Sequence, residues 1–151
     1  MKKNDFGYHQ VNKDEHYNKV QEVFNSVANE YDFMNDVMSF GFHRNWKKEF
    51  VGLIEINDEN DTKILDLAGG TGDIAKRILK SHPNTSIEII DKNFLMLKEC
   101  ITKDNVLKSN KINLICGDGE NIPLHDNSMD VITLSFGIRN MTDRIKCLKE
   151  C

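Results

Sequence analysis

The chain has 151 residues, a formal net charge of −4 at pH 7 and 39% hydrophobic residues. This length is enough to bury the core of one domain, and the acidic balance argues against nucleic acid as the main partner. The sequence has no apolar run of membrane-spanning length and no apolar segment near its start that predicts a secretory signal.

The cysteines predict reduced thiols rather than a metal site or a disulfide framework. They are Cys100, Cys116, Cys147 and Cys151. They form no CxxC pair, and no histidine lies near the last two in sequence, so their spacing lacks the pattern of a metal-ligand set. We therefore expect no metal site and a reducing compartment.

The first third of the chain predicts a polar start followed by helices. Residues 1–18 are polar, and we interpret them as a flexible segment. Apolar residues then recur at helical spacing, with a break at Gly41: Val20, Phe24, Val27, Tyr31, Met34, Val37, Met38, Phe40, Trp46, Phe50, Leu53 and Ile54. We interpret residues 19–56 as an N-terminal helical cap and the charged run 57–62 as a solvated linker.

After the linker, short strands alternate with helices. The predicted elements are strand 63–68, helix 73–80, strand 86–90, a helix capped by Asn93 to about residue 101, strand 111–116, strand 129–136 and a helix from Thr142 or Asp143 onward. This alternation predicts an α/β fold with a doubly wound parallel sheet, covered by helices on both faces.

The strongest chemical signal is the segment Leu65–Ala75, "LDLAGGTGDIA". Within it, residues 70–75 fit the dinucleotide pattern G-x-G-x-x-G/A. Asp91 follows Gly72 by nineteen residues, at the end of the second strand, where an acid binds ribose hydroxyls. These features predict an adenosine-containing cofactor without saying which one. A nicotinamide cofactor and a tight turn without a ligand remain as alternatives.

Two features favour a methyl donor over a nicotinamide cofactor. In "CGDGENIPLHDNSMDVITLSFGIRN", residues 116–140, the acid pair after the third strand and the D-x-I-x-x-x-x-G pattern of the fourth resemble S-adenosylmethionine-dependent methyltransferases. Asp66 in "DLAGGTG" also matches their D-x-G-x-G-x-G form, with Ala68 in place of the first glycine.

Five motifs in order carry a closer resemblance. They are Phe6-Gly7-Tyr8, "SVANEYDFMND", "MSFGFHRNWK", "AGGTGDIA" and "SFGIRNMTD". Over nearly the whole chain they resemble the ubiquinone/menaquinone biosynthesis C-methyltransferase family. The resemblance implies a Rossmann-like methyltransferase sheet with N-terminal helices. Of that sheet the chain carries the first four strands, so residues 63–151 correspond to the N-terminal half of the methyltransferase domain.

The resemblance implies S-adenosyl-L-methionine as the cofactor, and nine residues that bind it: Asp66, Gly69, Gly70, Thr71, Gly72, Asp91, Asp118, Gly119 and Ser135. The glycine-rich loop would line the methionine end, Asp91 would bind the ribose, and Asp118 and Gly119 would flank the adenine. Many relatives have alanine at the position of Gly119. For Ser135, a packing role is the alternative.

The resemblance also implies the reaction, which is methyl transfer to a ring carbon of a polyprenyl benzoquinol or naphthoquinol. Arg139 is the leading candidate for stabilising a phenolate, and an ion pair with Asp143 is the alternative. Asn140 would orient the ring hydroxyl. Tyr31 and His43 are further catalytic candidates, and for His43 packing or capping is the alternative.

A polyprenyl substrate implies work at a membrane surface, or within a complex of quinone-biosynthesis enzymes, without a spanning helix. A homodimer is compatible with this. The compartment would be the cytoplasm in a bacterium and the matrix face of the inner membrane in a mitochondrion. The segment Phe33–Phe42 would either cover the apolar tail of the substrate or belong to the core.

The sequence stops within the helix after the fourth strand, where the family continues with three more strands. We therefore expect a fragment or the product of a truncated gene, with the fourth strand left as a bare sheet edge. We also expect the isolated chain to bind cofactor weakly and to transfer little methyl. The alternatives are a small-molecule methyltransferase with another acceptor and a non-catalytic remnant or complex subunit.

Overall fold

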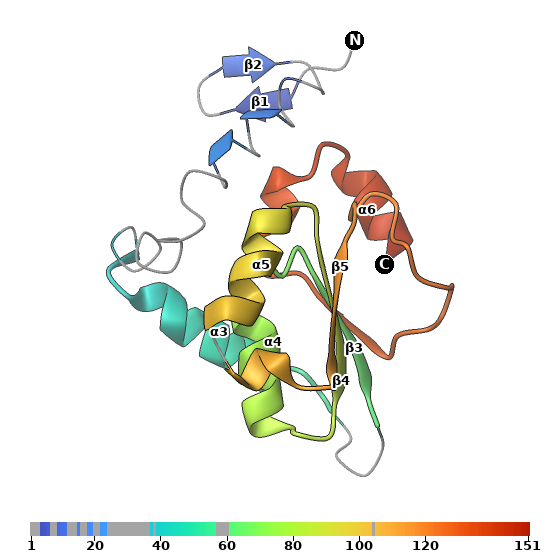
Figure 1. The fold of residues 1–151 in the computed structure, drawn as a ribbon. Coiled ribbons are helices and arrows are strands. Elements are labelled where there is room, and N and C mark those ends of the chain that lie inside the picture. Colours follow the sequence, from blue (N-terminus) through green and yellow to red (C-terminus); the bar gives the residue numbers. More distant parts are fainter. Residues whose placement is uncertain are drawn as a thin grey trace.

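The computed structural model describes residues 39–56, 61–103 and 105–151, together with 4–6, 9–11, 15, 18–19, 22–23 and 37. Its centre is a parallel four-stranded sheet (Figure 1). The strands are β3 (Lys63–Leu67), β4 (Ser86–Asp91), β5 (Ile112–Cys116) and β6 (Val131–Thr133), in the order β5-β4-β3-β6. This confirms the predicted parallel sheet.

Helices cover both faces of the sheet, as predicted. On one face lie α3 (Phe42–Gly52), α4 (Asp73–Ser81), α5 (Phe94–Lys103) and the 3₁₀ turn η2 (Asn105–Lys108) (Figure 1). Buried side chains of α4 and α5 pack there against one face of β3 and β4. On the other face, Cys147 of α6 (Arg144–Glu150) joins a second core with Leu65, Leu67 and Ile90. Burial on both faces explains why β3 is an almost unbroken apolar run.

The strand register aligns the carboxyl ends of three strands. Leu67 of β3 pairs with Ile90 of β4, and Asp91 pairs with Cys116 of β5. The loops that follow these strands therefore leave the sheet at the same edge. In open α/β sheets, this is the edge at which ligands bind.

The fourth strand is shorter than predicted. The apolar run suggested residues 129–136, whereas β6 covers only Val131–Thr133. Phe136 has a φ of 59°, which ends the extended backbone, and the chain then enters the 3₁₀ turn η3 (Ile138–Asn140). Within the described residues, β6 pairs with β3 on one side and with no strand on the other, so the expected bare edge is present.

Part of the segment 1–18, for which we expected flexibility, is described by the structure. Two short antiparallel strands, β1 (Asn4–Phe6) and β2 (His9–Val11), pair within this segment. Their spacing leaves two residues between them, with Gly7 first, which is typical of a hairpin. In the predicted cap, α3 begins at Phe42, and its N-cap is Gly41, whose φ is 77°. Most of the apolar series before it, Tyr31 included, lies outside the described residues.

In the described part of the chain, no helix combines the length and the apolar character that a membrane crossing needs.

Candidate active site

A cavity of about 260 Å³ lies at the carboxyl edge of the sheet. Four loops supply most of its wall: residues 68–71 after β3, 91–93 after β4, 117–120 after β5, and 135–137 with 139–142 after β6. Three residues of helix α3, His43, Trp46 and Lys47, also line the cavity, as does Ser39 just before this helix. The cavity therefore brings together residues of every predicted site motif that the structure describes.

The glycine-rich loop is held tightly against the sheet. A Cβ atom on Gly69 would lie 2.7 Å from Ile89 Cγ2 and 2.8 Å from Asp66 Oδ2, so only glycine fits there. Gly69, Gly70 and Thr71 line the cavity. The sequence analysis placed the methionine end of the cofactor against this loop, where glycine lets a ligand approach the protein backbone closely.

Gly72, one of the predicted cofactor-binding residues, has a packing role in the structure. It does not belong to the residues that line the cavity. Its φ is 78°, and it is the N-cap of α4. A Cβ atom here would lie 2.7 Å from Cys100 Sγ and 2.9 Å from Leu107 Cδ1. Gly72 is thus required by a left-handed backbone and by packing against α5 and η2, which a ligand motif alone does not reveal.

Asp91 ties the glycine-rich loop to the next strand. Its Oδ2 accepts a hydrogen bond from the Gly70 backbone amide (2.9 Å), and its Oδ1 accepts one from the Asn93 amide (2.8 Å). Burial raises the pKa of Asp91, and these amides offset part of that rise. Asn93 in turn caps α5, as predicted, by accepting from the amides of Leu95 and Met96. Asp91 therefore both faces the cavity and fixes its wall.

Asp66 is fully buried at the end of β3 and lines the cavity. Thr133 Oγ1 on the neighbouring strand β6 donates a hydrogen bond to Asp66 Oδ1 (2.9 Å). Asp66 Oδ2 has no hydrogen-bond partner among the described residues. Burial raises the pKa of Asp66 to about 7, because the bond from Thr133 offsets only part of the desolvation. Asp66 is thus a buried acid whose hydrogen bonds compensate only part of the cost of burying its charge.

The raised pKa of Asp66 predicts a pH-dependent stability. Folded Asp66 holds a proton up to about pH 7, whereas its ordinary pKa is 3.8. The folded state therefore binds more protons than the unfolded chain between these values, so the free energy of unfolding falls as pH rises through this window. The measurement is the free energy of unfolding in urea at pH 5 and at pH 8. Between these pH values, we expect it to fall by roughly 2 kcal/mol more in the wild type than in Asp66→Asn. Equal losses in the two proteins would contradict this assignment.

The third loop carries the predicted acid pair. Burial would raise the pKa of Asp118, but the hydrogen bond from Lys92 Nζ (2.7 Å) and the Glu120 amide outweigh it and hold the pKa below its usual range. Glu120 Oε1 accepts from the amides of Thr142 (2.6 Å) and Asp143 (2.8 Å). Asp118 and Gly119 line the cavity beside Asp91, while Glu120 fixes the segment that carries Arg139.

The catalytic candidates Arg139 and Asn140 lie in η3 and line the cavity, as does Ser135. A Cβ atom on Gly137 would lie 2.6 Å from the Cβ atom of Ala68, so the loop after β6 packs closely against the loop after β3. Asp143, the alternative partner of Arg139, is the N-cap of α6 and accepts a hydrogen bond from the Lys146 amide.

His43 also lines the cavity and is buried. The Ser39 hydroxyl lies 2.8 Å from His43 Nδ1 and accepts a hydrogen bond from the His43 backbone amide (3.3 Å). These contacts fix the position of the imidazole ring, and the tautomer of the ring decides which of the two atoms donates. Tyr31, the other candidate, lies outside the described residues.

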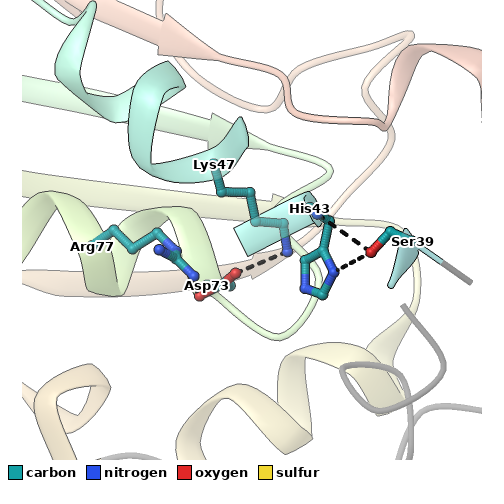
Figure 2. A network of polar contacts seen from close by, with 5 residues as sticks. All are labelled: Ser39, His43, Lys47, Asp73 and Arg77. Atoms are coloured by element: carbon teal, nitrogen blue, oxygen red, sulfur yellow. Dashed lines mark hydrogen bonds and ion pairs between the residues drawn. The ribbon is translucent and has the colours of Figure 1, made fainter. Parts of the chain in front are cut away.

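The sequence analysis did not predict the ion-pair network that joins α3 to α4 beside the cavity (Figure 2). Lys47 Nζ of α3 lies 2.8 Å from Asp73 Oδ2 of α4, and Arg77 Nε lies 3.0 Å from Asp73 Oδ1. Lys47 and Asp73 line the cavity, and Lys47 is buried. The i, i+4 spacing of Asp73 and Arg77 is visible in the sequence. The Lys47 partner lies 26 residues away, which no local pattern reveals.

The strand order, the glycine-rich loop and the acids at the carboxyl edge define a Rossmann-like methyltransferase fold. The YcgJ protein from Bacillus subtilis has a similar fold (TM-score 0.63, 19% identity, 72% of this chain and 44% of that chain covered). So does the plantazolicin methyltransferase BpumL, solved in complex with a monoazolic desmethylPZN analog and SAH (TM-score 0.62, 22% identity, 91% of this chain and 54% of that chain covered).

The chain belongs to the ubiE/COQ5 methyltransferase family, whose model matches residues 10–151. It is 41% identical to the mitochondrial 2-methoxy-6-polyprenyl-1,4-benzoquinol methylase of Caenorhabditis elegans, with 99% of this chain and 53% of that protein covered. It is 40% identical to the ubiquinone/menaquinone biosynthesis C-methyltransferase UbiE of Methylobacterium nodulans, with 97% and 58% covered. The chain thus spans little more than half the length of these relatives, which are mitochondrial and bacterial.

Proposed function

We propose that this chain carries the cofactor site of a C-methyltransferase of quinone biosynthesis. The methyl group would pass from S-adenosylmethionine to a ring carbon of a polyprenyl benzoquinol or naphthoquinol. One observation carries the proposal: the fold brings Asp91, the glycine-rich loop and Arg139 to one cavity at the carboxyl edge of the sheet. The names of relatives about 40% identical supply the acceptor class.

The residues present fit this cofactor. Asp91 faces the cavity where a carboxylate can accept from ribose hydroxyls, and Asp118 and Gly119 lie beside it on the adenine side. At the other end, the carboxyl group of Asp66 lines the cavity, and in its ionised form it suits the ammonium group of the methionine portion. When bound, the cofactor supplies an electrophilic methyl group. The tight packing of Gly69 and the tether from Asp91 to Gly70 hold the loop in place beneath it.

The acceptor side is formed by the loop after β6 and by α3. Arg139 provides a fixed positive charge for a developing phenolate, and Asn140 provides an amide to orient the ring hydroxyl. Trp46 and Phe136 line the same cavity with side chains that are 53% and 44% exposed. These two aromatic side chains suit the apolar ring and the first part of a polyprenyl tail.

The chemistry of such a substrate also bears on location. A polyprenyl quinol resides in a membrane, so we propose that the protein meets it at the membrane surface or receives it from another enzyme of the pathway. In a bacterium this surface would be cytoplasmic, and in a mitochondrion it would be the matrix face of the inner membrane. A homodimer is compatible with either arrangement.

Product analysis tests the proposal directly. An excess of the chain would be incubated with trideuteromethyl-labelled S-adenosylmethionine and one acceptor. The acceptors are a short-chain polyprenyl benzoquinol, the corresponding naphthoquinol, both reduced with dithionite, and catechol. The products would be identified by mass spectrometry. We expect slow labelling of a quinol ring carbon, absent with Asp91→Ala. Labelling of catechol in preference to both quinols would instead indicate another acceptor. Binding of S-adenosylhomocysteine without transfer to any acceptor would indicate a non-catalytic protein.

A further inference from the structure

Acidic side chains outnumber lysine and arginine side chains in the wall of the cavity. Five acidic residues line it: Asp66, Asp73, Asp91, Asp118 and Glu120. Among the described residues, the lysine and arginine side chains in the wall are Lys47, Lys92 and Arg139. The proposed cofactor carries a carboxylate of its own at the methionine end. A carboxylate entering this acidic cavity needs a cation near the glycine-rich loop.

Lys92 and Arg139 are poorly suited to that role. Lys92 pairs with Asp118 at 2.7 Å, on the side of the cavity assigned to adenine. Its side chain is 40% exposed, so solvent screens its charge. Arg139 lies in η3, on the loop after β6, on the side assigned to the acceptor.

Lys47 has the required position and a surplus charge. It belongs to α3, which packs against α4, the helix that follows the glycine-rich loop. Asp73 binds Lys47 through Oδ2 and Arg77 through Oδ1 (Figure 2). One carboxylate is thus shared by two cations, so this group of three carries a net charge of +1. The Lys47 side chain is only 9% exposed, which keeps its charge effective.

We propose that Lys47 is a cofactor-binding residue that holds the carboxylate of the methionine portion. The inference rests on the proposed function, because it takes the cofactor from there. An ammonium group has three N–H donors, and the bond to Asp73 Oδ2 uses one. The others are available to a carboxylate beside Gly69–Thr71, which line the same cavity. Asp73 is then the residue that aims Lys47, and α3 becomes part of the cofactor site.

Two ligands that differ only in the carboxylate measure its contribution to binding. S-Adenosylhomocysteine carries the carboxylate, whereas decarboxylated S-adenosylhomocysteine lacks it and keeps the amine. In calorimetry, the wild-type chain should bind S-adenosylhomocysteine at least about 10-fold more tightly than the decarboxylated ligand. In Lys47→Met, we expect S-adenosylhomocysteine to bind about 10- to 100-fold more weakly and the decarboxylated ligand to bind within about 3-fold of wild type.

Matched variants separate this role from a structural one. Lys48→Met changes the next, exposed lysine of α3, and should bind both ligands as wild type does. Lys47→Arg keeps the charge, and should preserve the preference for S-adenosylhomocysteine even if Lys47→Met does not fold. Equal weakening of both ligands in Lys47→Met, or no preference in the wild type, would overturn the inference. Wild-type protein that binds neither ligand would overturn the proposed function as well.

Discussion

Replacing Arg139 by glutamine is expected to lower the rate of methyl transfer about 100- to 1000-fold. It should change the Kd for S-adenosylhomocysteine by less than about 3-fold. The reason is that negative charge develops on the acceptor oxygen as the ring carbon attacks. The Arg139 guanidinium lines the cavity on the acceptor side, and it keeps its charge at every accessible pH. Glutamine retains hydrogen-bond donors but no charge.

The measurement is the single-turnover rate of labelled methyl transfer at saturating cofactor, beside calorimetry with S-adenosylhomocysteine. Arg139→Lys keeps a charge without the planar fork and should give an intermediate rate. Arg44→Gln is the matched control, because Arg44 is an exposed arginine of α3 that does not line the cavity. A wild-type rate in Arg139→Gln would show that this arginine has no part in the chemistry.

The second large effect concerns Asp91. Replacing it by alanine is expected to weaken S-adenosylhomocysteine binding at least about 100-fold, or roughly 3 kcal/mol. The variant loses the acceptor for ribose hydroxyls. It also frees the amides of Gly70 and Asn93, which Asp91 holds at 2.9 Å and 2.8 Å. The ligand contact and the shape of the glycine-rich loop are therefore lost together.

Asp91→Asn divides these two contributions. Asparagine keeps one carbonyl oxygen, which can hold one of the two amides, and carries no charge for the ribose. We expect its affinity to lie between those of wild type and Asp91→Ala. Affinity equal to wild type in Asp91→Asn would mean that the charge of Asp91 contributes nothing to binding.

The sequence predicted three of the four strands well. The runs that form β3, β4 and β5 were placed to within one residue, because each is a short run rich in isoleucine and leucine bounded by polar or turn-forming residues. The fourth strand was predicted too long for a local reason. Its apolar run continues through Phe136, whereas β6 ends at Thr133. The composition of the run does not reveal the positive φ that Phe136 adopts.

Several residues predicted for the site line one cavity because each lies at or after the end of a strand, and parallel strands bring their carboxyl ends to one edge of the sheet. They are Gly69–Thr71, Asp91, Asp118 and Arg139. Gly72 was assigned to the ligand because it belongs to the same motif, but its neighbours are side chains from α5 and η2. Those contacts are set by tertiary packing, which a motif does not contain.

Lys47 was missed for the same reason. A lysine in a basic segment such as "HRNWK" is expected on an exposed helix face. The burial of Lys47 follows only from the packing of α3 against α4. The Thr133 bond to Asp66 likewise joins two strands 67 residues apart in sequence. Both are pairings across the fold, so only the three-dimensional arrangement identifies them.

The central claim is that the carboxyl edge of this sheet binds the methyl donor through Asp91. Calorimetric titration of the chain with S-adenosylhomocysteine tests it, with Asp91→Ala and Asp130→Ala titrated in parallel. Asp130 is a suitable control, because its carboxylate also accepts a backbone amide, that of Lys63 (2.8 Å), but it does not line the cavity. We predict saturable binding to the wild type and to Asp130→Ala, and its loss in Asp91→Ala. Equal binding to all three proteins, or binding to none of them, would contradict the claim.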